Sequence, residues 1–349
     1  AACGGNSTQT DTAAPSEQTE ESSSVSDGSA SDETTVENTE TETPADETEA
    51  SEPAEKVDIN LAALSGPTAL GMLDLLEKND NGEAATIATA PDEVTGKIIS
   101  GELDIAAVPT NVASTLYNKT EGQVQIAALN TMGVLYVLET GDTIQSIADL
   151  AGKTIYATGQ GSTPEYALNL VLEKNGLTPG EDVEIVFAAD NAEIAPLLAS
   201  GEAQVALLPQ PFVTSVLTQN ENVRVALDLT EEWDKAVNGE SGLTMGCVVV
   251  RKEFAEQNKE ALDRFLDEYK QSVETVTSEE GLAHAAELAE HYNIIKAAVA
   301  EKAIPECNIV FVEGDEMQQI AGGFLQVLYD ANPQAVGGQL PNDDFYYKR

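Results

Sequence analysis

Two glycine turns in this sequence carry hydroxyl side chains at matching places, and these turns are its strongest candidates for ligand-binding chemistry. The first reads Ser65-Gly66-Pro67-Thr68 and the second reads Gln160-Gly161-Ser162-Thr163. Each follows an apolar run typical of a strand and precedes helical spacing that ends in Leu-Glu-Lys-Asn. Because a helix leaves its first backbone N–H groups without partners, such a turn makes a polar binding point where the strand ends. Alternatively, Thr68 and Thr163 simply cap the helices.

Polar residues also follow later strand-like runs in both copies, next to Pro109 and Pro209 or within a break in a long β-rich run. If the two copies form facing lobes, these loops meet across one crevice. We therefore predict that a small ligand contacts all of them. The predicted contacts are Ser65, Gly66, Pro67, Thr68, Thr110, Asn111, Asn130, Thr131, Gln160, Gly161, Ser162, Thr163 and Gln210.

The sequence lacks the motifs of the common enzyme classes. Gly159-Gln160-Gly161 begins like a dinucleotide fingerprint, but Pro164 stands where the third glycine should be. There is no Gly-Lys-Ser/Thr phosphate loop and no Gly-x-Ser-x-Gly nucleophile elbow. The only histidines, His284 and His291, lie among charged residues typical of a surface, and no cluster completes a metal site around them. We predict a protein that is not an enzyme and holds no cofactor and no metal.

A second repeat shows which elements position these turns. The segment 100–109 closely parallels 200–209, and both begin with Ser-Gly-Glu and end in Pro. Two repeats in the same order indicate a duplicated unit of strand, glycine turn, helix, strand, helix and strand. The predicted fold class is therefore α/β, with two similar lobes and a ligand cleft between them. We predict lobe 1 over residues 56–138 and 245–349, and lobe 2 over residues 139–244, with the chain crossing near 136–140 and 243–248.

The hydrophobic periodicity predicts the individual elements. Strands are expected at 57–64, 84–90, 103–108, 124–138 with a break at 130–133, 153–158, 183–188, 204–208, 223–227, 243–250 and 309–312. Helices are expected at 68–78, 92–100, 111–117, 143–150, 164–174, 191–199, 211–218, 254–276, 279–291, 294–303 and 315–329.

Charge excludes some classes of partner. The chain has 349 residues and a formal net charge of −44, with 17 Lys and Arg against 61 Asp and Glu. Phosphate backbones and anionic lipid surfaces attract basic proteins, so we predict no nucleic-acid partner. No run approaches the roughly 18 apolar residues that a membrane-spanning helix needs.

Residues 1–55 differ from the rest in composition. They contain no Lys, Arg or aromatic residue, and about 15 acidic residues lie among Ser, Thr, Pro and Ala. Such a segment buries too little apolar surface to offset its ordering entropy, so we predict a disordered acidic linker.

The sequence surroundings of the three cysteines predict different roles for them. Small residues before Cys3 resemble the end of a bacterial lipoprotein signal, in which the cysteine becomes the lipidated N-terminus, and we expect the apolar part of that signal to precede the printed sequence. A stray terminal thiol is the alternative. Cys247 and Cys307 lie in apolar runs, which favours buried small hydrophobes over a disulfide.

Several of these segments also carry a family resemblance. The chain resembles the extracellular substrate-binding proteins of ABC transporters with the type II periplasmic-binding fold, in the group that includes nitrate, sulfonate, taurine and thiamine-pyrimidine-precursor binders. The resemblance covers roughly 57–349 and is carried by segments 64–68, 104–111, 150–155, 161–163, 332–333 and 345–347. It implies a monomer on the outer face of the bacterial cytoplasmic membrane that holds its ligand between the lobes and delivers it to a membrane permease.

The resemblance leaves the ligand open. The candidate loops contain no Lys or Arg, so an anion would depend on helix N-termini and hydroxyl groups alone. A small anion and a neutral or zwitterionic organic molecule both stay open. Tyr166, Phe212 and Trp233 could stack on a ring or belong to the core. An enzyme or a surface adhesin built on the same two-lobe fold is the alternative function.

Overall fold

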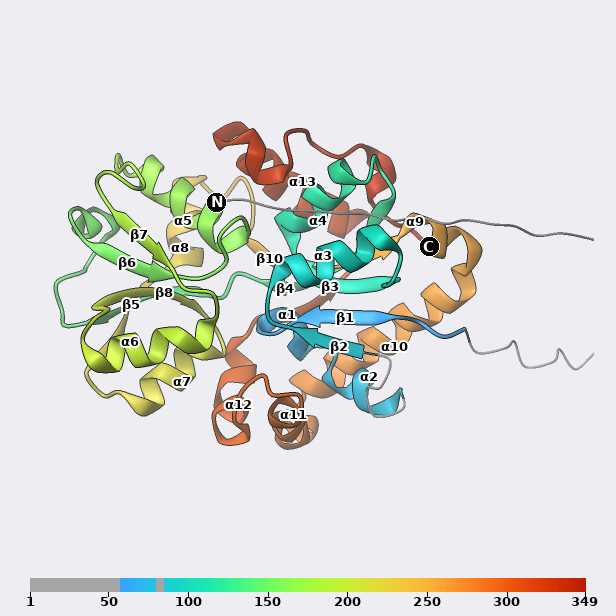
Figure 1. Ribbon diagram of the computed structural model, residues 1–349, viewed down its shortest axis with the longest axis horizontal. Coiled ribbons are helices and arrows are strands. Elements are labelled where there is room, and N and C mark those ends of the chain that lie inside the picture. The colour runs from blue at the N-terminus through green and yellow to red at the C-terminus, as the bar shows by residue number, and fades with distance from the viewer. Residues whose placement is uncertain (1–56, 80–84) are drawn as a thin grey trace, which may run out of the picture. The chain divides into compact units, whose positions relative to one another are not determined.

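The computed structural model describes residues 57–79 and 85–349. In this part of the chain the strands form two sheets with helices on both sides, which confirms the predicted α/β class and the two lobes (Figure 1). We call the six-stranded sheet with its helices lobe 1, and the five-stranded sheet with its helices lobe 2. The predicted linker 1–55 and the predicted lipidation site Cys3 lie outside the described residues.

The two sheets repeat one topology. Lobe 1 has the strand order β11-β4-β10-β3-β1-β2, and lobe 2 has the order β7-β6-β8-β5-β9. In each, three neighbouring strands run parallel, and the next two antiparallel pairings complete the common five strands. The strands of lobe 1 are β1 (Leu61–Leu64), β2 (Ala85–Ala88), β3 (Ile105–Pro109), β4 (Val124–Met132), β10 (Thr244–Arg251) and β11 (Ile309–Val312). Those of lobe 2 are β5 (Leu135–Thr140), β6 (Thr154–Ala157), β7 (Glu184–Phe187), β8 (Val205–Pro209) and β9 (Val223–Asp228).

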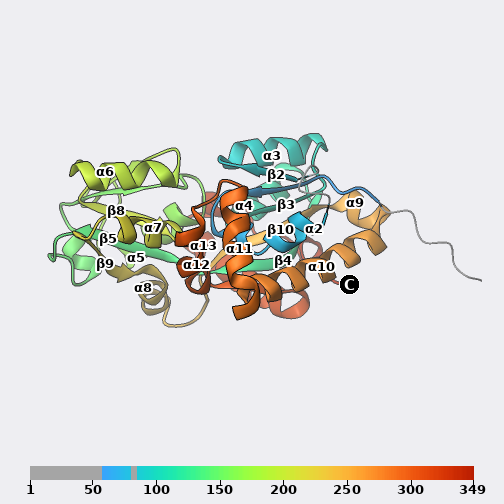
Figure 2. The ribbon, with the colours of Figure 1, turned by 90° about the horizontal axis from the view of Figure 1, so that it is seen from below.

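Helices connect the strands and cover both faces of each sheet (Figure 2). They are α1 (Pro67–Leu70), α2 (Leu73–Lys78), α3 (Pro91–Ser100), α4 (Thr110–Lys119), α5 (Thr163–Lys174), α6 (Ile194–Ser200), α7 (Phe212–Gln219), α8 (Leu229–Ala236), α9 (Lys252–Gln257), α10 (Lys259–Thr277), α11 (Glu279–His291), α12 (Ala297–Ala303) and α13 (Gly314–Ala331). Short 3₁₀ turns lie at Ile147–Leu150, Asn191–Glu193, Ile304–Glu306, Pro333–Val336 and Asp343–Phe345. The repeated Ser-Gly ends α3 and α6 in the same way, because Gly101 and Gly201 both take the left-handed conformation that favours glycine. None of the described helices is long and apolar enough to cross a membrane.

The buried hydrophobic residues of the described chain form three clusters, and the largest of them contains residues of both lobes, including Trp233. Trp233 is fully buried, its ring lies 5.5 Å from that of Phe324, and its indole N–H donates to the Ser241 carbonyl. Trp233 is therefore a core residue and does not stack on a ligand. Cys247 and Cys307 are buried and unpaired with each other, as predicted for small hydrophobes.

The strands change sheet between Met132 and Leu135 and return between Asp228 and Thr244. The passages therefore run through 133–134 and 229–243, earlier than the predicted crossings. The exact lobe limits, 56–138 with 245–349 and 139–244, stay a prediction.

Some predicted elements were wrong in extent. The predicted helix 68–78 is broken at Gly71-Met72, and the helix 254–276 is broken at Asn258 into α9 and α10. The predicted helix 143–150 is only the 3₁₀ turn Ile147–Leu150, because the carboxylates of Glu139 and Asp149 accept the N–H groups of residues 143–146. Helix α8 was not predicted.

Candidate functional site

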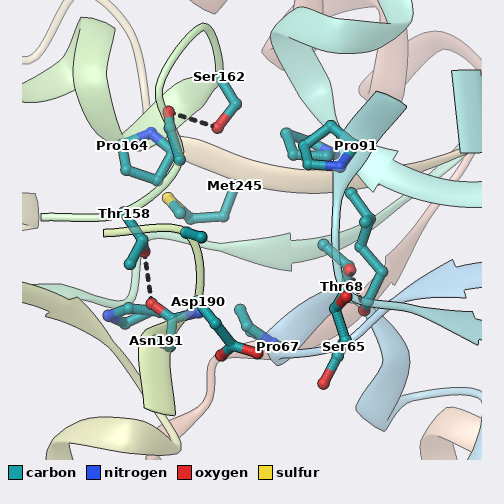
Figure 3. A pocket seen from close by; sticks show the side chains of 16 residues that line it. Ser65, Pro67, Thr68, Pro91, Thr158, Ser162, Pro164, Asp190, Asn191 and Met245 are labelled. Carbon is teal, nitrogen blue, oxygen red and sulfur yellow. Dashed lines mark hydrogen bonds between the residues drawn. The ribbon is translucent and has the colours of Figure 1, made fainter. Parts of the chain in front are cut away.

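A cavity of about 110 Å³ lies where the loops of the two lobes meet (Figure 3). It is enclosed by loops that follow the carboxyl ends of β1, β2 and β3 in lobe 1 and of β6, β7 and β8 in lobe 2, with Met245 of β10 beside them. In sheets with parallel strands, ligands bind at this end of the strands. The lining residues are Leu64, Ser65, Pro67, Thr68, Thr89, Pro91, Pro109, Thr158, Gly159, Ser162, Pro164, Ala189, Asp190, Asn191, Pro209 and Met245.

The wall from lobe 1 is built by the first glycine turn. Thr68 is buried, and its hydroxyl donates to the Leu64 carbonyl at 3.0 Å. The backbone N–H of Ser65 donates to the Ala88 carbonyl at 2.7 Å, which ties this turn to the end of β2. Helix α1 begins at Pro67, where the missing N–H of proline costs no intrahelical hydrogen bond.

The wall from lobe 2 holds the second glycine turn and the loop after β7. The Ser162 hydroxyl donates to the Gly159 carbonyl at 2.8 Å, and the Thr158 hydroxyl donates to Asn191 Oδ1 at 2.5 Å. One oxygen of Asp190 accepts the backbone N–H of Ala192 at 2.9 Å. Figure 3 shows Asp190 extending from this wall toward Pro67 of the opposite lobe.

The threonines of the glycine turns do not cap their helices. The first N-cap position is Gly66 and the second is Ser162, and neither makes a side-chain capping bond. Thr163 instead donates its hydroxyl to Asn111 Oδ1 at 3.2 Å. The capping interpretation is therefore wrong for both.

Four of the predicted contacts line the cavity: Ser65, Pro67, Thr68 and Ser162. The other nine do not, and they are Gly66, Thr110, Asn111, Asn130, Thr131, Gln160, Gly161, Thr163 and Gln210. Four of these nine make hydrogen bonds that hold the lining turns in place, namely Asn111, Asn130, Thr131 and Thr163. Asn130 Nδ2 donates to the Thr68 carbonyl at 3.1 Å, and the Thr131 hydroxyl lies 3.0 Å from Asn130 Oδ1. Thr110 and Thr244 share a hydrogen bond of 3.0 Å between their hydroxyls.

Gln160 and Gln210 have different surroundings. Gln160 is exposed on its turn. Gln210 Oε1 accepts both the N–H and the hydroxyl of Thr214, so its side chain serves the start of α7.

Asn111 links the two lobes. It lies at the start of α4 in lobe 1 and is fully buried. Its Nδ2 donates to the Ala335 carbonyl at 2.9 Å and to the Gly161 carbonyl at 3.3 Å, while its Oδ1 accepts from Thr163. Both polar atoms of one amide thus hold the second glycine turn of lobe 2 against lobe 1.

Twelve lining positions were not predicted as ligand contacts, including Thr89, Thr158, Asp190, Asn191 and Met245. Asp190 and Asn191 follow β7, and Thr89 follows β2, so they share the strand-end position of the residues that were predicted. The rule that ligands bind at the carboxyl ends of parallel strands, applied to every strand and not only to the repeated motifs, would have found them.

The cavity lining offers hydroxyl and amide groups for hydrogen bonds beside apolar proline and methionine carbons. It contains one carboxylate, no Lys or Arg and no Cys. Cys247 lies nearby on β10, but burial raises the pKa of its thiol, so it stays protonated and unreactive. Within residues 57–79 and 85–349 there is no group of three or more His, Cys, Asp and Glu side chains that could hold a metal ion.

Two larger hollows lie elsewhere on the described part of the chain. One, of about 360 Å³, lies between α7 and the α11–α12 connection, and another, of about 520 Å³, lies beside Lys252, Lys259 and Lys348. Neither is formed by the strand ends of both sheets. The lysines of the second are paired with Asp344, Asp263 and Asp315. The smaller interlobe cavity is therefore the better candidate.

Comparison with protein families gives a match over most of the folded chain. The family of ABC transporter, phosphonate, periplasmic substrate-binding proteins matches residues 73–302. A search by sequence among curated proteins gave no match.

Solved structures share the fold. An ABC transporter protein from Parabacteroides distasonis is 24% identical, with 83% of this chain and 99% of that chain covered and a TM-score of 0.68. The periplasmic aliphatic sulphonate binding protein of Escherichia coli is 15% identical, with 83% and 92% covered and a TM-score of 0.64. The alkanesulfonate-binding protein of Xanthomonas axonopodis pv. citri bound to MOPS is 16% identical, with 83% and 96% covered and a TM-score of 0.63.

Proposed function

Because this chain belongs to the family of ABC transporter, phosphonate, periplasmic substrate-binding proteins, we propose that the cavity between its lobes is where it holds the molecule that is to be imported. The protein is the substrate-binding component of an ABC import system and works outside the cytoplasm, where it binds a small molecule and delivers it to a membrane permease. The identity of its ligand does not follow from these similarities, because a shared fold at low sequence identity does not imply a shared substrate.

The observation that carries the proposed site is the convergence of six strand ends from two sheets on one cavity. Ser65 and Thr68 approach from lobe 1, and Thr158, Ser162 and Asn191 approach from lobe 2. A ligand that touches both walls favours the closed arrangement by as much as it binds that arrangement more tightly than the open one. We propose Ser65, Pro67, Thr68 and Ser162 as direct contacts, with Asn111, Asn130, Thr131 and Thr163 positioning the turns.

The passages between the lobes support a hinge. Within residues 57–79 and 85–349, two stretches of chain join the sheets, 133–134 and 229–243. A few residues in such stretches absorb the change in backbone angles during domain closure. We propose that the lobes close on the ligand about these passages. The protein acts as a monomer and carries out no chemistry on its ligand.

We also propose that Cys3 is lipidated and anchors the protein to the outer face of the cytoplasmic membrane. The support is the run of small residues before Cys3 and the acidic segment that separates it along the sequence from the lobes. Mass spectrometry of the N-terminal peptide of the native protein tests this, and an unmodified Cys3 would overturn it.

Native mass spectrometry of freshly purified protein tests the binding function. We expect one small molecule bound per chain and recovered chemically unchanged, and its addition to stripped protein should raise the melting temperature. Conversion of the molecule would favour an enzyme, and the absence of any bound or stabilising small molecule would favour an adhesin.

A further inference from the structure

The proposed ligand cavity is poor in hydrogen-bond donors and rich in acceptors. Each of three hydroxyl groups on its walls already donates within the protein: Thr68 to the Leu64 carbonyl, Ser162 to the Gly159 carbonyl and Thr158 to Asn191 Oδ1. A hydroxyl has one hydrogen and two lone pairs, so these three oxygens are left as acceptors. Among the lining side chains of the described residues, Asn191 Nδ2 and the hydroxyls of Ser65 and Thr89 are left free to donate.

Three backbone donors at the two glycine turns are also occupied. The N–H of Ser65 donates to the Ala88 carbonyl, and that of Ser162 donates to the Gly159 carbonyl. The N–H of Gly161 donates to the carboxylate of Glu165 in its own helix. The sequence makes these turns candidate anion sites, but three of their backbone donors are satisfied internally.

Prolines remove further donors from the helix N-termini that face the cavity. Pro67, Pro91 and Pro164 stand in the first turn of α1, α3 and α5, and all three line the cavity. A helix N-terminus binds anions through its free N–H groups, and proline has none. These three positions therefore offer apolar ring carbons where an oxyanion would need donors.

The charge of the cavity lining also disfavours an anionic ligand. Asp190 is a cavity-lining carboxylate, and within the described residues it has no ion-pair partner. One of its oxygens accepts from Ala192, which leaves the other for a ligand. A phosphonate, a sulfonate or nitrate placed here would meet this carboxylate and would find no Lys or Arg in the lining to pair with.

We infer that the ligand of this cavity is a small organic molecule with a protonated amine, whose N–H groups donate to Asp190 and to hydroxyl oxygens among those of Thr158, Ser162 and Thr68. Its apolar part packs against Met245 and the prolines of the wall. The inference rests on the proposed function, and it sets this chain apart from the anion binders that its fold resembles.

Thermal shift against fractions of a small-molecule extract from the source cells tests the inference. The extract is split at low pH into cation-exchange-retained, anion-exchange-retained and unretained fractions. We expect the stabilising activity in the cation-exchange-retained fraction. Activity only in the other two fractions would overturn the inference and leave the binding function intact, whereas activity in none would overturn the proposed function itself.

A single substitution tests the negative charge of Asp190 separately from its structural hydrogen bond. Asp190→Asn removes the negative charge but keeps an oxygen that can accept from Ala192. We expect it to weaken binding of the active fraction by about ten-fold to a hundred-fold, the loss of hydrogen bonds to a charged group. Asp182→Asn is the matched control, because Asp182 is an exposed residue of lobe 2 whose carboxylate accepts the N–H of Thr178 away from the cavity. Unchanged or tighter binding in Asp190→Asn with normal melting behaviour would overturn the inference.

Discussion

Thr163 in lobe 2 donates its hydroxyl to Asn111 in lobe 1 at 3.2 Å, and both side chains are fully buried. The same amide of Asn111 reaches the Gly161 carbonyl, so one side chain of lobe 1 holds the second glycine turn of lobe 2. This link lies beside the ligand cavity without lining it. If the lobes open, both hydrogen bonds must break, so the link belongs to the closed arrangement.

Replacing Thr163 with Val keeps the shape of the side chain and removes only the hydroxyl. Asn111 Oδ1 then loses its donor in the closed protein, and a buried polar group without a partner costs about 1–3 kcal/mol. We therefore expect Thr163→Val to weaken ligand binding by that amount in titration calorimetry.

Thr154→Val is the control for this change. Thr154 lies in the same lobe and donates to Glu184 at 2.8 Å on an exposed surface, so its loss should leave affinity unchanged. Equal affinities for all three proteins would show that the link takes no part in closure.

Gly246 on β10 is a second point where the cavity depends on close packing. A Cβ atom there would lie 2.5 Å from both Asn130 Oδ1 and Thr68 Cγ2. We expect Gly246→Ala to lower the free energy of unfolding by about 1–3 kcal/mol, as overpacking does in a well-packed core. It should also weaken ligand binding, because Thr68 lines the cavity.

Gly96→Ala is the matched substitution without a clash. Gly96 lies within α3 and has open space around its Cα, so alanine should raise the free energy of unfolding by about 0.5–1 kcal/mol. Chemical denaturation of both variants measures the contrast, and a fully stable Gly246→Ala would contradict the packing around Thr68.

The duplicated motifs allowed the fold to be predicted from the sequence. Strand, glycine turn and helix recur with local signals, such as Pro91 at a helix start and Gly101 at a helix end, and these signals act within a few residues. The turns at Ser65 and Ser162 were found because the same local pattern marks both.

Residues that depend on tertiary contacts were harder to place. Asp190 and Asn191 carry no local motif, and only the parallel register of β6 with β7 brings them beside Thr158. Helix α8 was missed because it is short and its stability comes from Trp233, which packs against Phe324 nearly a hundred residues later. Such pairings between distant segments have no signature in a single stretch of sequence.

Glu139 makes the stability of lobe 2 depend on pH. Burial raises the pKa of its carboxyl, but hydrogen bonds from Thr143, from the Ile144 N–H and from Arg224 at 2.8 Å outweigh burial, and the net pKa is lowered. A carboxyl with a lowered pKa in the folded state stabilises the fold above its unfolded pKa of about 4.3 and loses this effect as the pH falls through the folded value.

Glu139→Gln should therefore lower the free energy of unfolding near neutral pH by about 1–3 kcal/mol, the value of hydrogen bonds to a charged group. Its curve of stability against pH should approach that of the wild type in acid. Glu232→Gln, which breaks the surface pair of Glu232 with Lys235, should change stability by less than about 1 kcal/mol. Parallel curves for Glu139→Gln and wild type would contradict a role for this carboxylate.

The two buried cysteines should resist alkylation in the folded protein. Burial raises the pKa of both thiols, and only the thiolate reacts with iodoacetamide. We expect Cys247 and Cys307 to stay unmodified at neutral pH and to react fully in denaturant, as read by peptide mass spectrometry. Rapid labelling of either in the native state would show that its surroundings open.

Hydrogen–deuterium exchange with and without the bound molecule tests the central claim most directly, because it locates the ligand on the chain without assuming its identity. We predict that binding slows exchange in loops of both lobes, at 64–68 and 89–90 in lobe 1 and at 158–163 and 189–192 in lobe 2. Exchange at the distant turn 178–182 should not change. Slowed exchange in only one lobe, or around the hollow between α7 and the α11–α12 connection, would contradict a ligand held between the strand ends of the two sheets.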